Sequence, residues 1–211
     1  MAYYPVFLDL TGRPCCVVGG GSVAERKVEG LVAAGARLTV VSPTLTPRLQ
    51  ALAHAGRLRH VGREYRAGDL AGQQLAFVAT DDGAVNAVVA AEAHARSVWL
   101  NAADDPPHCS FILPSVLRRG ALQVAVATGG ASPALSRAIR EELEGYFTEE
   151  YGALAALAAE VRQELAGAPS RPGAMAWGQA LAPDLRQLLA DGQRDEAKAR
   201  LLARLGVTAW R

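Results

Sequence analysis

VVGGGSVAERK, residues 17–27, runs from an apolar strand pattern through three consecutive glycines into an amphipathic helix pattern. Gly19, Gly21 and Ala24 give this stretch the G-x-G-x-x-A spacing that is typical of dinucleotide-binding loops. In such a loop, Gly19 permits the tight turn out of the strand and Gly21 lets the backbone approach a pyrophosphate, while Ala24 keeps the helix close to the sheet. The stretch therefore predicts an α/β fold that binds a nucleotide at the start of its first helix.

Backbone amides at Ser22 and Val23 open the expected helix, where they lack intrahelical acceptors and can bind a pyrophosphate. A glycine-rich turn can also serve structure alone, but the strand before it and the helix after it favour binding. The acidic residue expected about 20 positions later, which would bind the adenosine ribose, is absent. The second strand ends instead in Ser42, Pro43 and Thr44, where hydroxyls or backbone can bind the ribose. NAD and NADP are therefore not distinguished by this pattern.

Short apolar runs alternate with amphipathic stretches, as in a parallel sheet that helices cover on both faces. The expected strands are residues 15–18, 37–41, 57–61, 75–79 and 97–100, with two more at 111–113 and 122–127. The expected helices are residues 22–34 and 83–95, a helical stretch over 132–165, and a last helical region that ends at 205. Gly35 would end the first helix and Asp82 would cap the second. DDPPHCS at 104–110 predicts a loop, and APSRPG at 168–173 separates the last two helical regions.

Composition and charge argue against several classes of protein. The 22 basic and 21 acidic residues leave a formal net charge of +1 without a polybasic patch, so no nucleic-acid partner is expected. The chain starts without a basic leader and has no apolar run of membrane-spanning length, which predicts a cytoplasmic protein with no membrane partner. Cys15 and Cys16 are adjacent, so on a strand they would point to opposite faces and could not bind one metal ion together. No metal site is expected, because no cluster of residues has metal-ligand spacing.

Four further motifs follow the glycine loop in order: ATDD at 79–82, NAAD at 101–104, SFILPS at 110–115 and ATGGASPALSRAIREELE at 127–144. Together with GGGSVAERK, they resemble the family of precorrin-2 dehydrogenases and sirohydrochlorin ferrochelatases, which includes the N-terminal half of bifunctional siroheme synthases. The resemblance runs from about Val6 to at least Leu143 and continues more weakly to the end. It covers the dehydrogenase module, so the methylation of uroporphyrinogen is expected to belong to another protein.

The resemblance implies an NAD-dependent oxidation of a tetrapyrrole, precorrin-2, to sirohydrochlorin on the route to siroheme. The fold class it implies is α/β: a Rossmann-like parallel-sheet NAD-binding domain over 1–113, a small dimerisation segment over 114–146 that builds a homodimer, and a C-terminal helical domain over 147–211. Ferrochelation of sirohydrochlorin stays open as a second activity, because some relatives perform both reactions and others only oxidise. The main alternative is a non-catalytic NAD-sensing regulatory Rossmann protein. A generic alcohol or hydroxy-acid dehydrogenase is disfavoured, because the Tyr-x-x-x-Lys spacing of short-chain enzymes is absent.

The aspartate that this family uses in catalysis falls on Asp104, directly after an expected strand, where open α/β sheets bind ligands. Its carboxylate can accept the proton released as a hydride passes to the nicotinamide, or stabilise the positive charge that develops. The alternative is a structural role in the turn before Pro106, which is the favoured explanation for Asp105. Asn101 can orient Asp104 or the nicotinamide amide, or it can fix its own loop.

Several other residues are candidates for contacts with cofactor or substrate. Taken together, the glycine loop and the resemblance predict cofactor contacts at Gly19, Gly21, Ser22, Val23, Pro43, Thr44, Thr80 and Asn101. Arginines that can bind the substrate carboxylates are Arg118, Arg119, Arg137 and Arg140, each of which is also well explained as an ordinary surface residue. His108 is a further candidate for proton transfer or metal delivery. Thr128 stands where some relatives have a phosphorylated serine, and its alternative role is that of a helix-entry residue.

Overall fold

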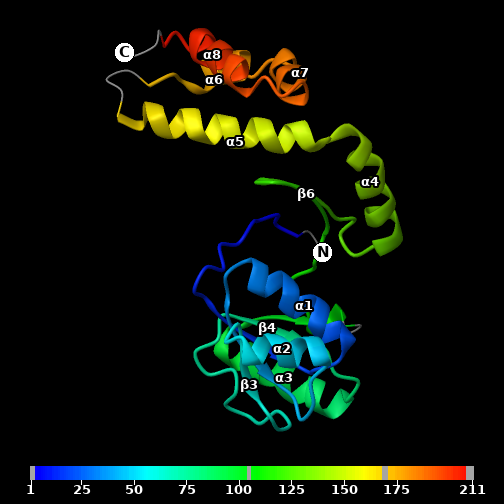
Figure 1. Cartoon of the computed structure of the whole chain (residues 1–211). Helices are drawn as coiled ribbons and strands as arrows, with labels where there is room; N and C mark the ends of the chain where they lie inside the picture. Colours follow the sequence, from blue (N-terminus) through cyan, green and yellow to red (C-terminus); the bar gives the residue numbers. More distant parts are fainter. Residues whose placement is uncertain (1–2, 104–105, 168–170, 208–211) are drawn as a thin grey trace. The chain divides into compact units, whose positions relative to one another are not determined.

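The computed structural model describes residues 3–103, 106–167 and 171–207. The chain divides into two compact units, Met1–Ile112 and Leu113–Arg211 (Figure 1). Each unit buries hydrophobic residues of its own: two clusters lie in the first unit and one in the second. Each unit therefore has a core that its own helices and strands supply.

A five-stranded parallel sheet forms the centre of the N-terminal unit, with the strand order β3-β2-β1-β4-β5. The strands are β1 (Pro14–Val18), β2 (Arg37–Val41), β3 (Arg59–Val61), β4 (Leu75–Val78) and β5 (Trp99–Ala102). Val18 pairs with both Val41 and Val78, so the three central strands end at the same level. The five runs predicted for this sheet each overlap an observed strand, and the Rossmann-like α/β class is confirmed.

Helices cover both faces of this sheet: α1 (Ser22–Ala33), α2 (Pro47–His54) and α3 (Gly83–Arg96). Residues of α1 and α2 share one hydrophobic cluster with Cys15, whereas residues of α3 share the other with Cys16. The two adjacent cysteines therefore lie on opposite faces, as their spacing predicts, and both are fully buried. Burial raises the pKa of the Cys15 thiol to about 11 and that of Cys16 to about 12.

The predicted ends of two helices are confirmed by their local geometry. Gly35 follows α1 with a φ of +74°, a left-handed conformation that suits glycine. The Asp82 carboxylate accepts hydrogen bonds from the amides of Ala84 (2.9 Å) and Val85 (3.2 Å) and so caps α3. The cap fixes the point at which the chain turns from β4 into α3.

The chain returns beside the edge strand β5 after a 3-10 turn, η1 (Pro106–His108). The Ser110 amide donates to the Leu100 carbonyl oxygen (2.7 Å), and the Leu100 amide donates to the Ser110 hydroxyl (3.2 Å). The strand predicted at 111–113 is wrong, because this segment is irregular. Its apolar character is explained by packing instead: the Phe111 ring lies edge-on to the buried Phe77 ring, with centroids 5.6 Å apart.

The C-terminal unit begins with an antiparallel hairpin of β6 (Ser115–Arg119) and β7 (Leu122–Val126). Gly120, with a φ of +54°, forms the turn. The strand β7 agrees with the run predicted at 122–127, whereas β6 was not predicted. Its sequence SVLRR has only two apolar residues, so the strand is too polar to stand out.

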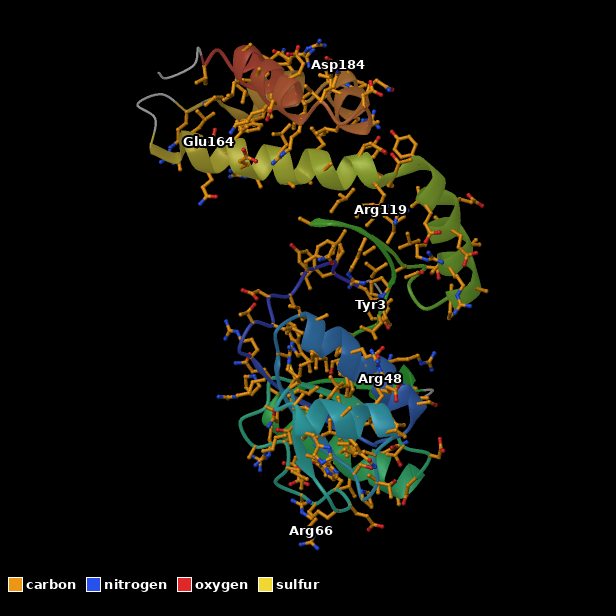
Figure 2. The ribbon with its side chains drawn as sticks, viewed as in Figure 1. Tyr3, Arg48, Arg66, Arg119, Glu164 and Asp184 are labelled. Atoms are coloured by element: carbon orange, nitrogen blue, oxygen red, sulfur yellow. The ribbon has the colours of Figure 1, made fainter. Side chains whose placement is uncertain are left out.

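Helices make up the rest of this unit: α4 (Pro133–Tyr146), α5 (Glu149–Glu164), the 3-10 turn η2 (Leu165–Gly167), α6 (Ala174–Ala180), α7 (Asp184–Ala190) and α8 (Arg194–Arg204). Ser132 caps α4 by accepting from the Leu135 amide at 3.1 Å, which confirms the predicted start. The helical stretch predicted up to residue 165 is interrupted after Tyr146. There the Arg119 Nε donates to the Phe147 carbonyl oxygen (2.9 Å), which stabilises the break (Figure 2).

The shorter helices α6, α7 and α8 pack along α5 around a common apolar cluster (Figure 1). Its buried members are Leu157, Val161, Leu165, Ala180, Leu185, Leu188, Ala197, Leu201 and Leu205. Ion pairs surround the cluster: Lys198 binds Glu164 (2.5 Å), and Arg204 binds Asp184 (2.7 Å) (Figure 2). The apolar residues supply most of the stabilisation, because exposed ion pairs contribute little.

Candidate functional site

Gly19 and Ala79 meet where the strand order of the sheet reverses, between β1 and β4. Gly19 has a φ of +116°, and its amide donates to the Val41 carbonyl oxygen at 2.9 Å. A Cβ on Gly19 would lie 2.2 Å from the Ala79 carbonyl oxygen, so no larger residue fits. In open α/β sheets the crevice at such a reversal is the place where ligands bind.

Gly20 brings the loop after β2 against the glycine turn. A Cβ on Gly20 would lie 2.0 Å from the Thr44 carbonyl oxygen and 2.7 Å from the Ser42 hydroxyl. The Thr46 amide donates to the Gly20 carbonyl oxygen at 3.0 Å. The two loops are therefore in direct backbone contact at the carboxyl edge of the sheet.

Gly21 differs from its two neighbours because no atom lies within 4 Å of the position that its Cβ would take. It occupies the N-cap of α1, and no side chain caps this helix. The amides of Ser22 and Val23 therefore open the helix towards an uncrowded space, while Ala24 is fully buried against the sheet. This arrangement fits a dinucleotide pyrophosphate, which binds helix N-termini through such amides.

The turn after β2 is held rigid by its own hydrogen bonds. The Ser42 hydroxyl donates to the Thr44 carbonyl oxygen at 2.7 Å, and the His60 Nε2 lies 2.9 Å from the Ser42 carbonyl oxygen. Pro43 and Thr44, both predicted cofactor contacts, are exposed at this turn. They border the glycine loop on the side where an adenosine ribose lies in this fold.

Thr80 follows β4 on the other side of the glycine turn. Its backbone nitrogen lies 3.4 Å from the position that a Cβ on Gly19 would take. Its hydroxyl accepts from the Asp82 amide (3.1 Å), and its carbonyl oxygen accepts from the Asn86 side-chain amide (3.3 Å). The sequence pattern did not single out Asn86, because a polar residue inside a helix carries no signal of its own.

Asn101 is the penultimate residue of β5, and its side-chain amide donates to the Phe111 carbonyl oxygen at 3.0 Å. Through this bond, Asn101 fixes the loop that follows β5, which is the alternative role considered for it from the sequence. Its contact with the cofactor stays a prediction. Asp104, the predicted catalytic residue, lies outside the described residues, as does Asp105. His108 and Cys109 line a cavity of about 480 Å³ together with residues of α3.

Three of the five candidate residues in the C-terminal unit bond neighbouring groups: Thr128, Arg119 and Arg140. The Thr128 hydroxyl accepts from the Ser132 amide (3.0 Å) and bonds the Ser132 carbonyl oxygen (3.0 Å), so it organises the start of α4. Arg119 binds Glu149 at 3.2 Å besides its bond to residue 147, and Arg140 binds Glu141 at 2.9 Å. Arg118 and Arg137 are exposed. Arg119 and Arg140 thus bind acidic neighbours, and substrate binding by the four arginines stays a prediction.

Among residues 3–103, 106–167 and 171–207, no three His, Cys, Asp or Glu side chains are grouped so that they could hold a metal ion. In the same part of the chain, none of the helices has both the length and the apolar character to cross a membrane.

Family models match both units of the chain. One, described as "Putative NAD(P)-binding", matches residues 6–115, more than half of the 211 residues. Another, described as the central part of a sirohaem biosynthesis protein, matches residues 119–146. The chain belongs to the NAD(P)-binding family that the first model describes, and it also carries the central segment of a sirohaem biosynthesis protein.

Individual members of the siroheme synthase family align with most of this chain. A siroheme synthase of Methylobacillus flagellatus is 46% identical over 163 residues, which are 77% of this chain and 35% of the relative. Siroheme synthase 1 of Aeromonas salmonicida is 42% identical over 206 residues, which are 96% of this chain and 44% of the relative. The chain thus spans less than half the length of these relatives.

A solved structure of SirC, a precorrin-2 dehydrogenase, is similar to this chain over nearly the whole length of both proteins. It has a TM-score of 0.74 and 28% sequence identity, and the match covers 97% of this chain and 99% of SirC. The Rossmann-like unit and the helical C-terminal part of this family member therefore have a counterpart in one known protein. The cofactor of the N-terminal unit is a nicotinamide dinucleotide, which the open N-terminus of α1 fits.

Proposed function

We propose that this chain oxidises precorrin-2 to sirohydrochlorin with NAD as the hydride acceptor, as the dehydrogenase of siroheme biosynthesis. The observation that carries the proposal is the backbone arrangement at Gly19, Gly20 and Gly21 in a chain that aligns with 99% of a precorrin-2 dehydrogenase. The alternative, a non-catalytic NAD-sensing regulator, draws no support from the named relatives, of which two are siroheme synthases and one is a precorrin-2 dehydrogenase by name.

The chain contributes binding, orientation and proton transfer to this reaction. Bound NAD supplies the ring carbon that accepts a hydride. The amides of Ser22 and Val23 hold the pyrophosphate, and Thr80 borders the nicotinamide half beside Gly19. The Asp104 carboxylate accepts the proton that leaves the macrocycle, a role supported by its sequence position after the last strand of the sheet.

The test is anaerobic turnover of enzymatically generated precorrin-2 with NAD, followed by the absorbance of sirohydrochlorin. Asp104→Asn is expected to lower kcat by at least about 100-fold, which is typical of the loss of a general base. The matched control is Asp105→Asn, which removes the neighbouring carboxylate and should retain turnover. NAD affinity should be unchanged in both variants. No turnover in a folded, NAD-binding wild type would contradict the proposal and favour the regulator.

We further propose that the chain acts as a homodimer through the dimerisation segment 114–146. Among the residues of α4, all of which the structure describes, only Ser136 is buried. Leu135 and Tyr146 are 51% and 65% exposed in a single copy, although α4 is strongly amphipathic. A second copy can cover such an apolar stripe.

Sedimentation velocity of the purified chain tests the dimer. The wild type should sediment at twice the monomer mass of 22.1 kDa. Leu135→Asp places a charge in the stripe and should shift the equilibrium towards monomer, whereas Ala131→Asp, on an exposed residue before the helix, should not. A monomeric wild type at all concentrations would contradict the homodimer.

A further inference from the structure

Asn86, on the first turns of α3, has a side-chain oxygen without a hydrogen-bond partner. Its Oδ1 is buried, and within the described part of the chain it is one of two buried side-chain oxygens in this state; the other is Gln73 Oε1. Buried polar groups are nearly always hydrogen-bonded, so each exception calls for an explanation such as a missing water or ligand.

The orientation of the Asn86 amide is determined by its other end. Nδ2 donates to the Thr80 carbonyl oxygen at 3.3 Å. A flipped amide would place Oδ1 against that carbonyl oxygen, and two acceptors would then face each other. The unpartnered oxygen is therefore a property of the site.

The position of Asn86 points to the dinucleotide as the missing partner. Asn86 contacts Thr80, and the backbone nitrogen of Thr80 lies 3.4 Å from the position that a Cβ on Gly19 would take, where the strand order of the sheet reverses. Thr80 is thus the one residue that lies between Asn86 and the glycine turn. Asn86 as a whole is only partly buried.

We infer that Asn86 recognises the bound dinucleotide: its Oδ1 accepts a hydrogen bond from the nicotinamide half, while its Nδ2 holds the Thr80 carbonyl beside the glycine turn. The donors in that half are the carboxamide N–H and the ribose hydroxyls. The inference concerns the cofactor alone, so it stands or falls independently of the tetrapyrrole substrate.

Gln73 provides the matched control. Its side-chain oxygen is also without a partner, but the residue lies away from the glycine turn. It lies in the turn before β4, where its backbone amide donates to the Leu70 carbonyl oxygen at 3.1 Å. That turn is at the amino edge of the sheet, opposite the edge where the glycine turn lies.

The experiment measures the Kd of NAD and of ADP-ribose by isothermal titration calorimetry, without substrate. Asn86→Leu should raise the Kd of NAD about tenfold, the effect of losing one hydrogen bond. Gln73→Met should leave it within about twofold of the wild-type value. If Asn86→Leu does not fold by circular dichroism, Asn86→Ala replaces it.

ADP-ribose, which lacks the nicotinamide ring, identifies the donor. A loss of affinity for NAD alone assigns the carboxamide, whereas an equal loss for both ligands assigns a ribose hydroxyl. An unchanged Kd for both ligands in a folded Asn86 variant would overturn the inference, and so would an equal loss in the Gln73 control.

Discussion

Gly152 on α5 lies directly against the backbone of Arg119, at the end of β6. A Cβ on Gly152 would be 2.6 Å from the Arg119 carbonyl oxygen and 3.2 Å from the Gly120 nitrogen. The hairpin turn and the helix therefore leave no room for a side chain at Gly152. Arg119 strengthens the joint, because its guanidinium bonds the Phe147 carbonyl oxygen just before the same helix.

This contact predicts that Gly152→Ala destabilises the chain. The added methyl group must push α5 away from the hairpin, at a cost of about 1–3 kcal/mol. Chemical unfolding followed by circular dichroism measures the effect. Gly145→Ala on α4 is the control, because nothing lies within 4 Å of its Cβ position, and alanine there should be neutral or stabilising by up to about 1 kcal/mol. Equal stability of the two variants would argue against the close contact.

The glycine turn predicts opposite effects for two neighbouring substitutions. Gly21→Ala should leave the melting temperature unchanged, since its Cβ meets no atom, yet raise the Kd of NAD by at least about tenfold by filling the pyrophosphate space. Gly19→Ala should lower stability by several kcal/mol, because of its φ of +116° and the Ala79 carbonyl oxygen. Thermal unfolding and calorimetric titration of both variants test this. Loss of stability in Gly21→Ala would show that this glycine serves the fold.

The Arg63–Asp69 pair predicts a pH-dependent contribution to stability. Hydrogen bonds from Arg63, at 2.7 Å to each carboxylate oxygen, hold the pKa of Asp69 below its ordinary value, assisted by the Arg66 amide (2.9 Å). The folded chain therefore releases this proton more readily than the unfolded chain. The resulting stabilisation is fully present above the unfolded pKa of about 3.9 and is lost as the pH falls through the lower folded value.

Asp69→Asn should accordingly cost about 1–2 kcal/mol at pH 7, and this difference from the wild type should shrink towards pH 2. Urea unfolding at a series of pH values measures both curves. Asp81→Asn, at an exposed position after β4, is the control and should follow the wild type. A gap that stays constant with pH would mean that the charge of Asp69 is not what stabilises the pair.

The buried cysteines predict slow thiol chemistry. Burial raises the pKa of Cys15 to about 11 and that of Cys16 to about 12, so almost no thiolate exists at pH 7.5, and neither sulfur is accessible. Iodoacetamide followed by peptide mass mapping should leave both residues unmodified in the native chain and modify both in urea. Rapid native labelling of either cysteine would contradict the observed packing of β1.

The sheet was predictable because its central strands β2, β1 and β4 are short apolar runs, buried on both faces and separated by helices. The prediction failed where that relation breaks down. The run at 111–113 is apolar because Phe111 packs on Phe77, and β6 is largely polar although it pairs along its whole length with β7. An apolar run therefore predicts burial. It predicts a strand only where the backbone is also hydrogen-bonded to a neighbouring strand.

The part of the site that glycines build could be predicted from the sequence. The G-x-G-x-x-A spacing already assigns different roles to Gly19 and Gly21, whereas the role of Gly20 is seen only in its contact with residue 44. Asn86 could not be found from the sequence, because the feature that marks it is a hydrogen bond it lacks. Asp104 and ferrochelation stay predictions.

Both lateral edges of the parallel sheet are poor templates for another strand. β3 has three residues, Arg59, His60 and Val61, of which the first two are polar and exposed. β5 is bonded by Ser110 through both its amide and its hydroxyl. Edge strands that are short, charged or covered resist pairing with other chains. The two edges of the sheet therefore offer few free backbone groups to which a strand of another chain could pair.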